Sequence, residues 1–278
     1  MQTITILGCG YVGQAIAPVF IQGGYRVTAT TTRAERVPEL EAIAHQVHVV
    51  RGHERERLAQ ILADQQTLVL TLGAARADAY ADTYLGTAQA IADLLPSLPQ
   101  LTQVIYTGSY AVYGDRQGAW VDETTAIAPS TDNGKILADT EQILLSTATD
   151  QRRVCIFRLG GIYGPGRSLV RIFQRAAGTT RPGTGEDASN WIHLDDIVGA
   201  IALAQQQGLQ GIYNLVQDSP TTVKQLIDLV CQRHQLPPVT WDASQPSTRP
   251  YNARVSNQKL KDAGYSFQHT TLEAGLVL

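Results

Sequence analysis

The chain has 278 residues, a net charge of −3 and a pI near 6.1, enough length for one large α/β domain or a larger domain with a small appendage. A weakly acidic chain without a basic run lacks the electrostatic footprint of a nucleic-acid-binding protein. No apolar stretch approaches the roughly 20 residues of a membrane span. Cys9, Cys155 and Cys231 have no disulfide-like spacing, so we expect buried, reduced thiols and a cytoplasmic protein.

Strand and helix patterns alternate from the first residues. The near-continuous apolar run 68–72 is typical of a parallel strand that is buried on both faces. Strands joined by crossover helices predict an α/β fold, a Rossmann-type doubly wound parallel sheet. We expect strands at 3–7, 25–30, 47–50, 68–72, 103–107 and 153–159, and helices at 11–22, 35–44, 55–63, 78–95 and 134–149.

The character of the sequence changes after Gly160, where Gly, Pro and Arg become frequent and the segments become shorter. Helices are expected near 196–206 and 222–234. We therefore predict an NAD(P)-binding domain over 1–160, with a strand and a helix added from 190–216. Residues 161–278 are expected to form a smaller substrate-binding region.

The first strand runs directly into a GxGxxG motif that opens a helix, which is the fingerprint of a dinucleotide-binding turn. Gly8 permits a tight turn, Gly10 lets the backbone approach a pyrophosphate, and Gly13 lets the helix press against the strand. The N–H groups at the helix start favour phosphate. We expect this turn, with Tyr11 and Val12, to bind the coenzyme; a plain strand–helix turn is the alternative.

The end of the second strand bears on the choice of coenzyme. NAD-binding proteins place a carboxylate about twenty residues after the glycines, whereas Thr31, Thr32 and Arg33 stand here and no acid precedes Glu35. A guanidinium and hydroxyls suit an adenosine 2′-phosphate. We favour NADP, with NAD as the alternative; a solvent-exposed Arg33 that only precedes the next helix is the other interpretation of that side chain.

Four further segments carry motifs in chain order: Tyr106–Gly114 with its Ser-x-x-Val-Tyr-Gly pattern, Arg158–Arg167, Trp191–Ile197 with His-Leu-Asp-Asp, and Arg254–Tyr265. Together these segments resemble the extended short-chain dehydrogenase/reductases of the NAD-dependent epimerase/dehydratase family. The chain's GxGxxG departs from the GxxGxxG of many extended members, and Arg51-Gly52-His53 stands where the family has Gly-Asp.

The resemblance implies hydride transfer between a substrate carbon and a nicotinamide coenzyme, on a sugar-like or small carbonyl or alcohol substrate. It implies that Ser109 holds the substrate oxygen and that Lys135 binds the nicotinamide ribose. It also implies that Gly73 and Ala74 are the small residues where the fourth strand meets the coenzyme. A homodimer is common among relatives and is left open here.

The main departure from the family is the position of the proton-transferring tyrosine. Four residues before Lys135, where the family has Tyr-x-x-x-Lys, this chain has Thr131. The phenol of tyrosine has a pKa near 10, and an aliphatic hydroxyl titrates nearer to the ~15.7 of water. The difference of about five pKa units corresponds to roughly 7 kcal/mol. Thr131 is therefore a weak substitute, although it can still hydrogen-bond a substrate or relay a proton through water.

Three ways to replace the tyrosine are consistent with the sequence. Asp132, Tyr110 or Tyr163 could supply the proton, or water could serve with slower turnover. Alternatively, the protein binds NADP without catalysis and acts as a sensor or interaction protein. We expect Tyr113 and Tyr163 mainly to line a cleft. The spacing of His45, His48 and His53 gives no metal signature, and no metal is expected.

Overall fold

The computed structural model describes residues 1–74 and 76–276, which divide into two compact units. Unit 1 comprises 1–109, 132–158 and 198–213, and unit 2 comprises 110–131, 159–197 and 214–278. Unit 2 thus also contains residues 110–131, which lie within the range 1–160 that the sequence predicted as the NAD(P)-binding domain. Because the chain passes between the units several times, each unit is built from segments that are distant in the sequence.

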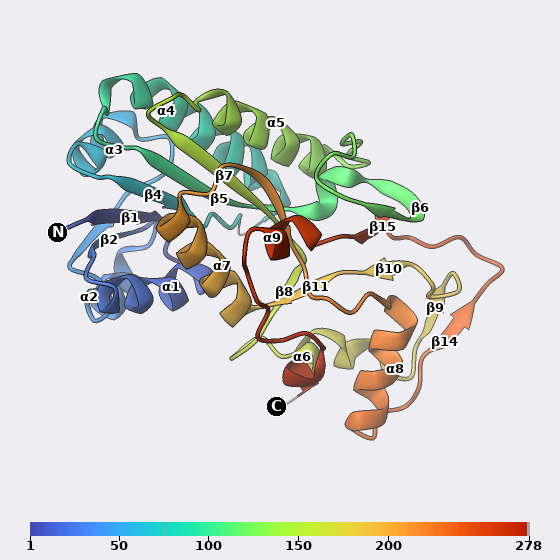
Figure 1. The fold of residues 1–278 in the computed structure, drawn as a ribbon. Coiled ribbons are helices and arrows are strands. Elements are labelled where there is room, and N and C mark those ends of the chain that lie inside the picture. The colour runs from blue at the N-terminus through green and yellow to red at the C-terminus, as the bar shows by residue number, and fades with distance from the viewer. Residues whose placement is uncertain (75, 277–278) are drawn as a thin grey trace. The chain divides into compact units, whose positions relative to one another are not determined.

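Unit 1 is organised around a seven-stranded sheet (Figure 1). Strand β1 pairs in parallel with β2 and β4, β2 pairs in parallel with β3, and β4 pairs in parallel with β5. This arrangement confirms the predicted α/β, Rossmann-type fold class. The order across the sheet is β12 (Gly211–Leu215), β7 (Arg153–Leu159), β5 (Gln103–Ser109), β4 (Thr67–Leu70), β1 (Thr3–Leu7), β2 (Arg26–Thr31) and β3 (Gln46–Val49).

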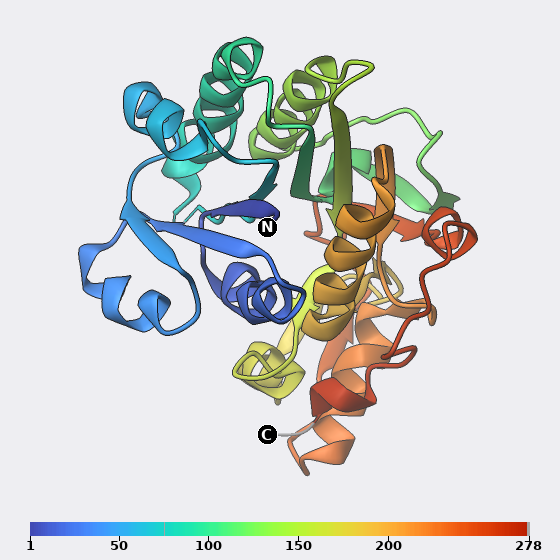
Figure 2. The same cartoon turned by 60° about the vertical axis from the view of Figure 1, so that its left-hand side comes forward.

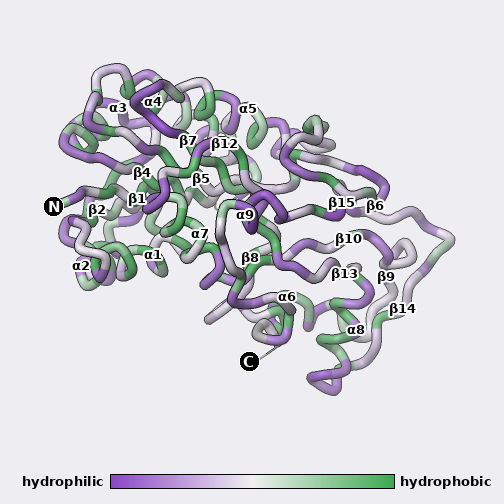
Figure 3. Tube along the Cα trace, in the orientation of Figure 1, coloured by the Kyte–Doolittle hydropathy of each residue, from purple (hydrophilic) through white to green (hydrophobic). Residues whose placement is uncertain are grey.

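Helices cover both faces of this sheet (Figures 1 and 2). On one face lie α3 (Arg55–Leu62), α4 (Thr87–Leu94) and α5 (Asp132–Ser146), and on the other lie α1 (Tyr11–Gln22), α2 (Val37–Glu41) and α7 (Leu194–Gln207). Hydrophobic and hydrophilic residues alternate along α5 (Figure 3), because only the face with Leu137, Ala138 and Leu144 is buried. Apolar side chains from β4, β5, α3 and α4 form the core on that side.

Two expected helices are shorter than the sequence pattern predicted. The helix expected at 35–44 is a 3₁₀ turn at Ala34–Arg36 followed by α2, because Pro38 is accommodated in the first helical turn and not in an interior. The helix expected at 78–95 is divided into a 3₁₀ turn at Ala77–Ala79, a π-helix at Ala81–Gly86 and α4. The other predicted strands and helices of unit 1 agree within a few residues.

Unit 2 consists of short strand pairs and helices in place of one sheet. The pairs β15 with β6, β11 with β8 and β14 with β9 are parallel, and β10 pairs with β13 antiparallel. A capping box between Thr222 and Gln225 starts α8 (Val223–Arg233). The other elements are β6 (Asp115–Val121), β8 (Gly161–Tyr163), β9 (Thr180–Pro182), β10 (Ala188–Ser189), β11 (Trp191–His193), β13 (Thr221–Thr222), β14 (Thr240–Asp242), β15 (Asn252–Val255), α6 (Leu169–Phe173) and α9 (Gln258–Asp262).

A buried ion pair joins α5 to β7 within unit 1. The guanidinium of Arg158 donates to the Glu141 carboxylate at 2.8 and 3.0 Å, and the two side chains are only 4% and 3% exposed. Removing one partner of such a pair leaves a buried charge without its counter-charge. The pair therefore fixes the position of α5 on the sheet.

We predict that Glu141→Ala lowers the free energy of unfolding by about 3–5 kcal/mol, because it leaves the Arg158 guanidinium buried without its carboxylate. Urea denaturation followed by circular dichroism measures this loss. Asp139→Ala, at an exposed position of the same helix, is the control and should change stability by less than about 0.5 kcal/mol. Equal losses in the two variants would contradict the role given to the pair.

Candidate functional site

The glycine turn between β1 and α1 has the geometry that its sequence predicts. Gly8 has a φ of +83°, which favours glycine, and a Cβ there would come within 3.2 Å of the Thr71 carbonyl oxygen. A Cβ on Gly13 would lie 3.0 Å from the side chain of Ile6, so the absence of a side chain lets α1 pack on β1. A Cβ on Gly10 would meet only the Gly8 carbonyl oxygen, at 3.8 Å. The turn is thus tight on its sheet side and open at Gly10.

Polar groups from two neighbouring strands hold the turn in place. Thr30 of β2 accepts a hydrogen bond from the Gly8 N–H at 3.0 Å, and its carbonyl accepts from the Cys9 N–H at 2.8 Å. Thr71, just after β4, donates its hydroxyl to the Gly8 carbonyl at 2.9 Å. Gly10 caps α1 without a side-chain hydrogen bond. A backbone held in this way can present the first N–H groups of α1 to an anion.

Two arginines lie after the end of β2, and the sequence analysis singled out one of them. Arg33 is exposed, with its Nε 3.9 Å from a Glu35 carboxylate oxygen, so its guanidinium reaches solvent. Arg36 is largely buried and donates to the Cys9 carbonyl at 3.0 Å and to Glu39 at 3.3 Å. Arg36 was not predicted from the sequence, where its position three residues after Arg33 was the available signal.

The hydroxyls next to Arg33 are placed differently from each other. Thr31 is buried, and its Oγ1 accepts a hydrogen bond from the Arg33 N–H at 3.2 Å. Thr32 is exposed. Thr32 and Arg33 are therefore accessible at the end of β2, whereas Thr31 shapes the turn that presents them.

The segment after β4 passes beside the glycine turn. Gly73 is exposed, and a Cβ built on it would meet nothing within 4 Å. The Ala74 N–H and the Leu72 carbonyl both lie 3.5 Å from the hydroxyl of Tyr84, a half-buried side chain on the π-helix. Burial raises the pKa of Tyr84 above its usual value. Sequence reasoning did not single out this tyrosine.

The expected catalytic residues lie on three different segments. Ser109 is the last residue of β5, and Lys135 lies in the first turn of α5, both in unit 1. The Lys135 ammonium is exposed and donates to the Asp132 carboxylate at 2.9 Å. Thr131 precedes α5 and belongs to unit 2. The joint role of Ser109 and Lys135 is a prediction.

Two tyrosines that we expected to line a cleft are fully buried. The hydroxyl of Tyr113 donates to the Asn214 side chain at 2.9 Å, and that of Tyr163 donates to the Thr271 carbonyl at 3.1 Å. Their hydroxyls therefore serve internal hydrogen bonds of unit 2, and the expectation of cleft-lining residues was wrong. Tyr110 is also buried, and burial raises the pKa of its hydroxyl to about 12.

Arg249 is a second residue that sequence reasoning missed. Its guanidinium lies 5.5 Å over the Tyr251 ring and donates to the Ala188 carbonyl at 3.2 Å. Its Nε is buried and has no acceptor in the described part of the chain. In the part of the chain that the structure describes, no carboxylate oxygen lies within 4.0 Å of the Arg249 guanidinium. Such a donor attracts an anion.

His193, Asp195 and His269 form one group with ligand atoms close enough for a metal ion. His45, His48 and His53, whose spacing gave no metal signature in the sequence, are not part of this group. The Nδ1 of His193 already accepts the Asp195 backbone N–H at 3.1 Å, and the His269 Nε2 lies 3.1 Å from the Asp195 carboxylate. Burial and the neighbouring His269 lower the pKa of His193. The group is thus internally hydrogen-bonded at the start of α7.

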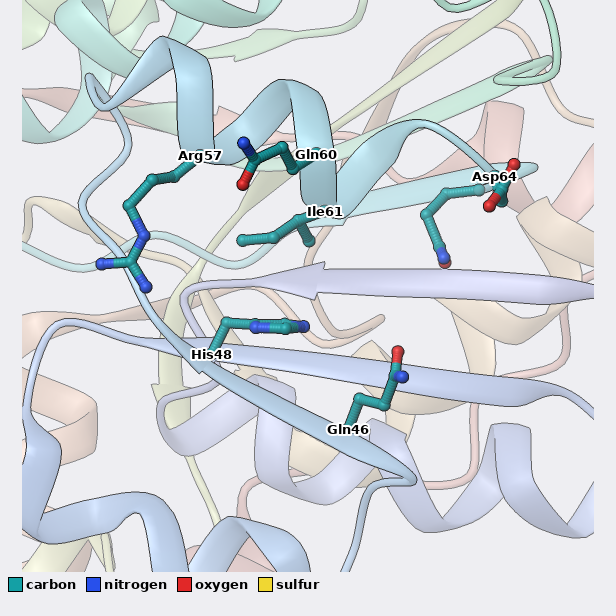
Figure 4. A pocket seen from close by; sticks show the side chains of 7 residues that line it. Gln46, His48, Arg57, Gln60, Ile61 and Asp64 are labelled. Atoms are coloured by element: carbon teal, nitrogen blue, oxygen red, sulfur yellow. The ribbon is translucent and has the colours of Figure 1, made fainter.

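A pocket of about 290 Å³ lies between β3 and α3 (Figure 4). His48 and Gln46 extend from the strand, and Arg57, Gln60 and Ile61 extend from the helix (Figure 4). Gln46 begins β3, so the pocket lies toward the amino end of the strand. Dinucleotides bind at the opposite, carboxyl edge of such sheets. The pocket is therefore separate from the glycine turn.

All three cysteines are buried, as expected from their unpatterned spacing. Burial raises the pKa of the Cys9 thiol, inside the glycine turn, to about 12, so this side chain is unreactive at neutral pH. Across the described residues, every helix is too short or too polar to cross a membrane.

The family model for the NAD-dependent epimerase/dehydratase family matches residues 4–215, a range that contains the glycine turn, Ser109 and Lys135. The chain belongs to this family. The matched range begins in β1 and ends in β12, so it includes every strand of the seven-stranded sheet.

Individual proteins are also similar to this chain. Protein YeeZ of Escherichia coli K12 is 34% identical over 223 residues, which cover 77% of each chain. A conserved protein of unknown function from Silicibacter pomeroyi is 25% identical, with a TM-score of 0.80 over 99% of this chain and 97% of its own. The dTDP-glucose 4,6-dehydratase of Bacillus anthracis, solved in complex with NAD, is 18% identical, with a TM-score of 0.81 over 99% and 94% of the two chains. The last likeness is one of fold.

Gly10→Ala tests whether the open side of the turn receives a ligand. A Cβ on Gly10 would meet only the Gly8 carbonyl oxygen, at 3.8 Å, so the methyl group itself clashes with no described residue; the melting temperature of the variant measures how well alanine tolerates the backbone φ of −91° and ψ of −143°. The added methyl group occupies the open side, and we expect NADPH to bind at least about tenfold more weakly in a fluorescence titration. Gly23→Ala, at the other end of α1, should bind NADPH like the wild type. Unchanged binding by Gly10→Ala would place the coenzyme elsewhere.

Proposed function

We propose that the protein is an NADP-dependent oxidoreductase or epimerase/dehydratase-like enzyme that acts by hydride transfer on a sugar-like or small carbonyl or alcohol substrate. The observation that carries the proposal is the glycine turn, which is held by Thr30 and Thr71 and is open at Gly10. Membership of an NAD-dependent family supports it. A bound nicotinamide coenzyme would supply the hydride donor or acceptor.

The residues that would hold the coenzyme fit its shape and charge. Backbone N–H groups of Tyr11, Val12 and Gly13, at the start of α1, suit the pyrophosphate. Gly73 and Ala74 offer a surface with little side-chain bulk beside the turn. Lys135 would bind the nicotinamide ribose, as the resemblance implies, after exchanging its exposed contact with Asp132.

The preference for NADP rests on Arg33, supported by Thr32. The exposed guanidinium can form a bidentate contact with the 2′-phosphate, and the nearby carboxylate of Glu35 is only loosely paired with it at 3.9 Å. Arg36 adds positive charge beside the turn while its own hydrogen bonds hold Cys9 and Glu39. NAD remains the alternative coenzyme, since the model that matches the chain is that of an NAD-dependent family.

Ser109 would hold the substrate oxygen. It ends β5, the strand next to β4, at the carboxyl edge where ligands of such sheets bind. A hydroxyl donor at a developing alkoxide lowers the barrier in the way that an oxyanion-hole donor does.

A second candidate function follows from Thr131. Because its hydroxyl is a poor acid, the protein could bind NADP without catalysis and act as a sensor or interaction protein. Tight NADPH binding without turnover of sugars, aldehydes or ketones, together with turnover gained by Thr131→Tyr, would favour this function over the enzyme.

Ser109→Ala tests the catalytic assignment. In a panel of sugars, aldehydes and ketones assayed for NADPH oxidation, we expect kcat to fall by about 10²–10³-fold, because one hydroxyl donor to the substrate oxygen is lost. NADPH affinity should stay within about twofold. Ser146→Ala, at an exposed site on α5, is the control. Full activity of Ser109→Ala would remove this residue from the mechanism.

Arg33→Ala tests the coenzyme preference. The loss of charge-assisted hydrogen bonds worth about 1.5–3 kcal/mol should weaken NADPH binding about 10–100-fold and leave NADH binding within about twofold. Isothermal titration calorimetry measures both affinities. Arg26→Ala, at the opposite end of β2, should affect neither. Equal losses for the two coenzymes would contradict a phosphate contact.

A further inference from the structure

The hydride transfer proposed above needs a proton-transferring group that Thr131 cannot readily replace. In the structure, each of the three side chains that the sequence offered as a replacement already has other contacts. Asp132 is exposed and paired with Lys135, and the Tyr163 hydroxyl donates to the Thr271 carbonyl. Tyr110 is buried in an apolar cluster of unit 2. With these three side chains engaged, the proton comes from water, which the sequence also left open, or from another side chain.

Tyr84 has its hydroxyl at the carboxyl edge of the sheet. The Tyr84 Oη lies 3.5 Å from both the Leu72 carbonyl oxygen and the Ala74 N–H, on the segment that follows β4. Hydrogen bonds at this distance are weak, so they orient the hydroxyl loosely. A ligand that reaches Leu72 and Ala74 can therefore form a hydrogen bond with the Tyr84 hydroxyl in place of these two weak bonds, and the free energy lost with them is small.

The sheet order places this hydroxyl between the two functional segments of unit 1. Strand β4 lies between β1 and β5. On one side, the Thr71 hydroxyl bonds to Gly8 of the glycine turn at 2.9 Å. On the other, Leu70 at the end of β4 is in register with Tyr106, three residues before Ser109 at the end of β5. The point between β1 and β4 is also where the strand order reverses, and ligands bind at such points.

The local backbone around Tyr84 is unusual. Tyr84 belongs to the π-helix Ala81–Gly86, where the sequence pattern predicted a regular helix. π-Helical turns occur frequently at functional sites. The side chain is half-buried, and its ring packs against Tyr80 with the ring centres 5.0 Å apart. The ring is thus held by packing while the hydroxyl stays at the edge of the sheet.

We propose that Tyr84 is the proton-transferring catalytic residue of this protein, in place of the tyrosine missing at position 131. The inference rests on the proposed function. In the reducing direction, a bound reduced nicotinamide would supply the hydride to the substrate carbonyl carbon and would itself be oxidised. Tyr84 would donate its proton to the carbonyl oxygen, which completes the alcohol, and the Tyr84 phenolate would then recover a proton from water. The reverse direction uses the phenolate as the base.

The pKa of Tyr84 depends on the charge next to its hydroxyl. Burial raises the pKa of this phenol, which keeps it protonated and makes it a weaker acid when no cation is beside it. A positively charged nicotinamide nearby would lower the pKa of the phenol, because an opposite charge favours the phenolate. The position of the hydroxyl therefore has a spectroscopic consequence that does not depend on knowing the substrate.

The first experiment is a pH titration of tyrosinate absorbance near 295 nm, with NADP⁺, with NADPH and without coenzyme. We expect NADP⁺, but not NADPH, to lower the pKa of one of the eleven tyrosines by about one unit or more. The shift of the pKa should vanish in Tyr84→Phe and persist in Tyr80→Phe. Tyr80 directly precedes the same π-helix and is the matched control. A shift that persists in Tyr84→Phe, or no shift despite NADP⁺ binding, would overturn the assignment.

The second experiment uses any substrate found in the NADPH oxidation panel. Tyr84→Phe should lower kcat by about 10²–10⁴-fold, the usual contribution of a positioned acid, while the NADPH dissociation constant and melting temperature stay near the wild-type values. Tyr80→Phe should retain kcat. Wild-type kcat in Tyr84→Phe would overturn the inference and leave the proposed function standing. Failure of the wild type to bind either coenzyme would overturn both.

Discussion

The structure of unit 1 depends on how the backbone turns from β1 into α1. Gly8 adopts a positive φ with the Thr71 carbonyl close to where a Cβ would stand, and the absence of a side chain on Gly13 lets the helix pack on Ile6. Hydroxyls of Thr30 and Thr71 then hold the turn from both neighbouring strands. An anion-binding helix start needs this rigidity, since ordering a loose loop on binding would oppose the affinity.

The same geometry distributes the functional groups along one edge of the sheet. In a parallel sheet the carboxyl ends of the strands share an edge, so the glycine turn, Arg33, Gly73, Tyr84 and Ser109 all gather there although they span about a hundred residues of sequence. From membership of the family we expect hydride transfer on this fold. The missing tyrosine makes the origin of the proton the feature that distinguishes this chain from the family pattern.

The glycine turn and most of the sheet could be predicted because their signals are local. A strand followed by GxGxxG, alternating apolar runs and glycine stops are each written in adjacent residues. Arg36, Tyr84 and Arg249 could not be found in this way, because their partners lie 27, 12 and 61 residues away in the sequence. The buried positions of Tyr113 and Tyr163 were missed for the same reason, since Asn214 and Thr271 satisfy their hydroxyls across about a hundred residues.

The most direct test of the central claim is a crystal structure of the protein soaked with NADP⁺. The account predicts the pyrophosphate against the first N–H groups of α1, beside Gly10, and the 2′-phosphate in contact with Arg33. Density for the coenzyme anywhere else, or a glycine turn that stays empty at saturating NADP⁺ and at saturating NAD⁺, would contradict it.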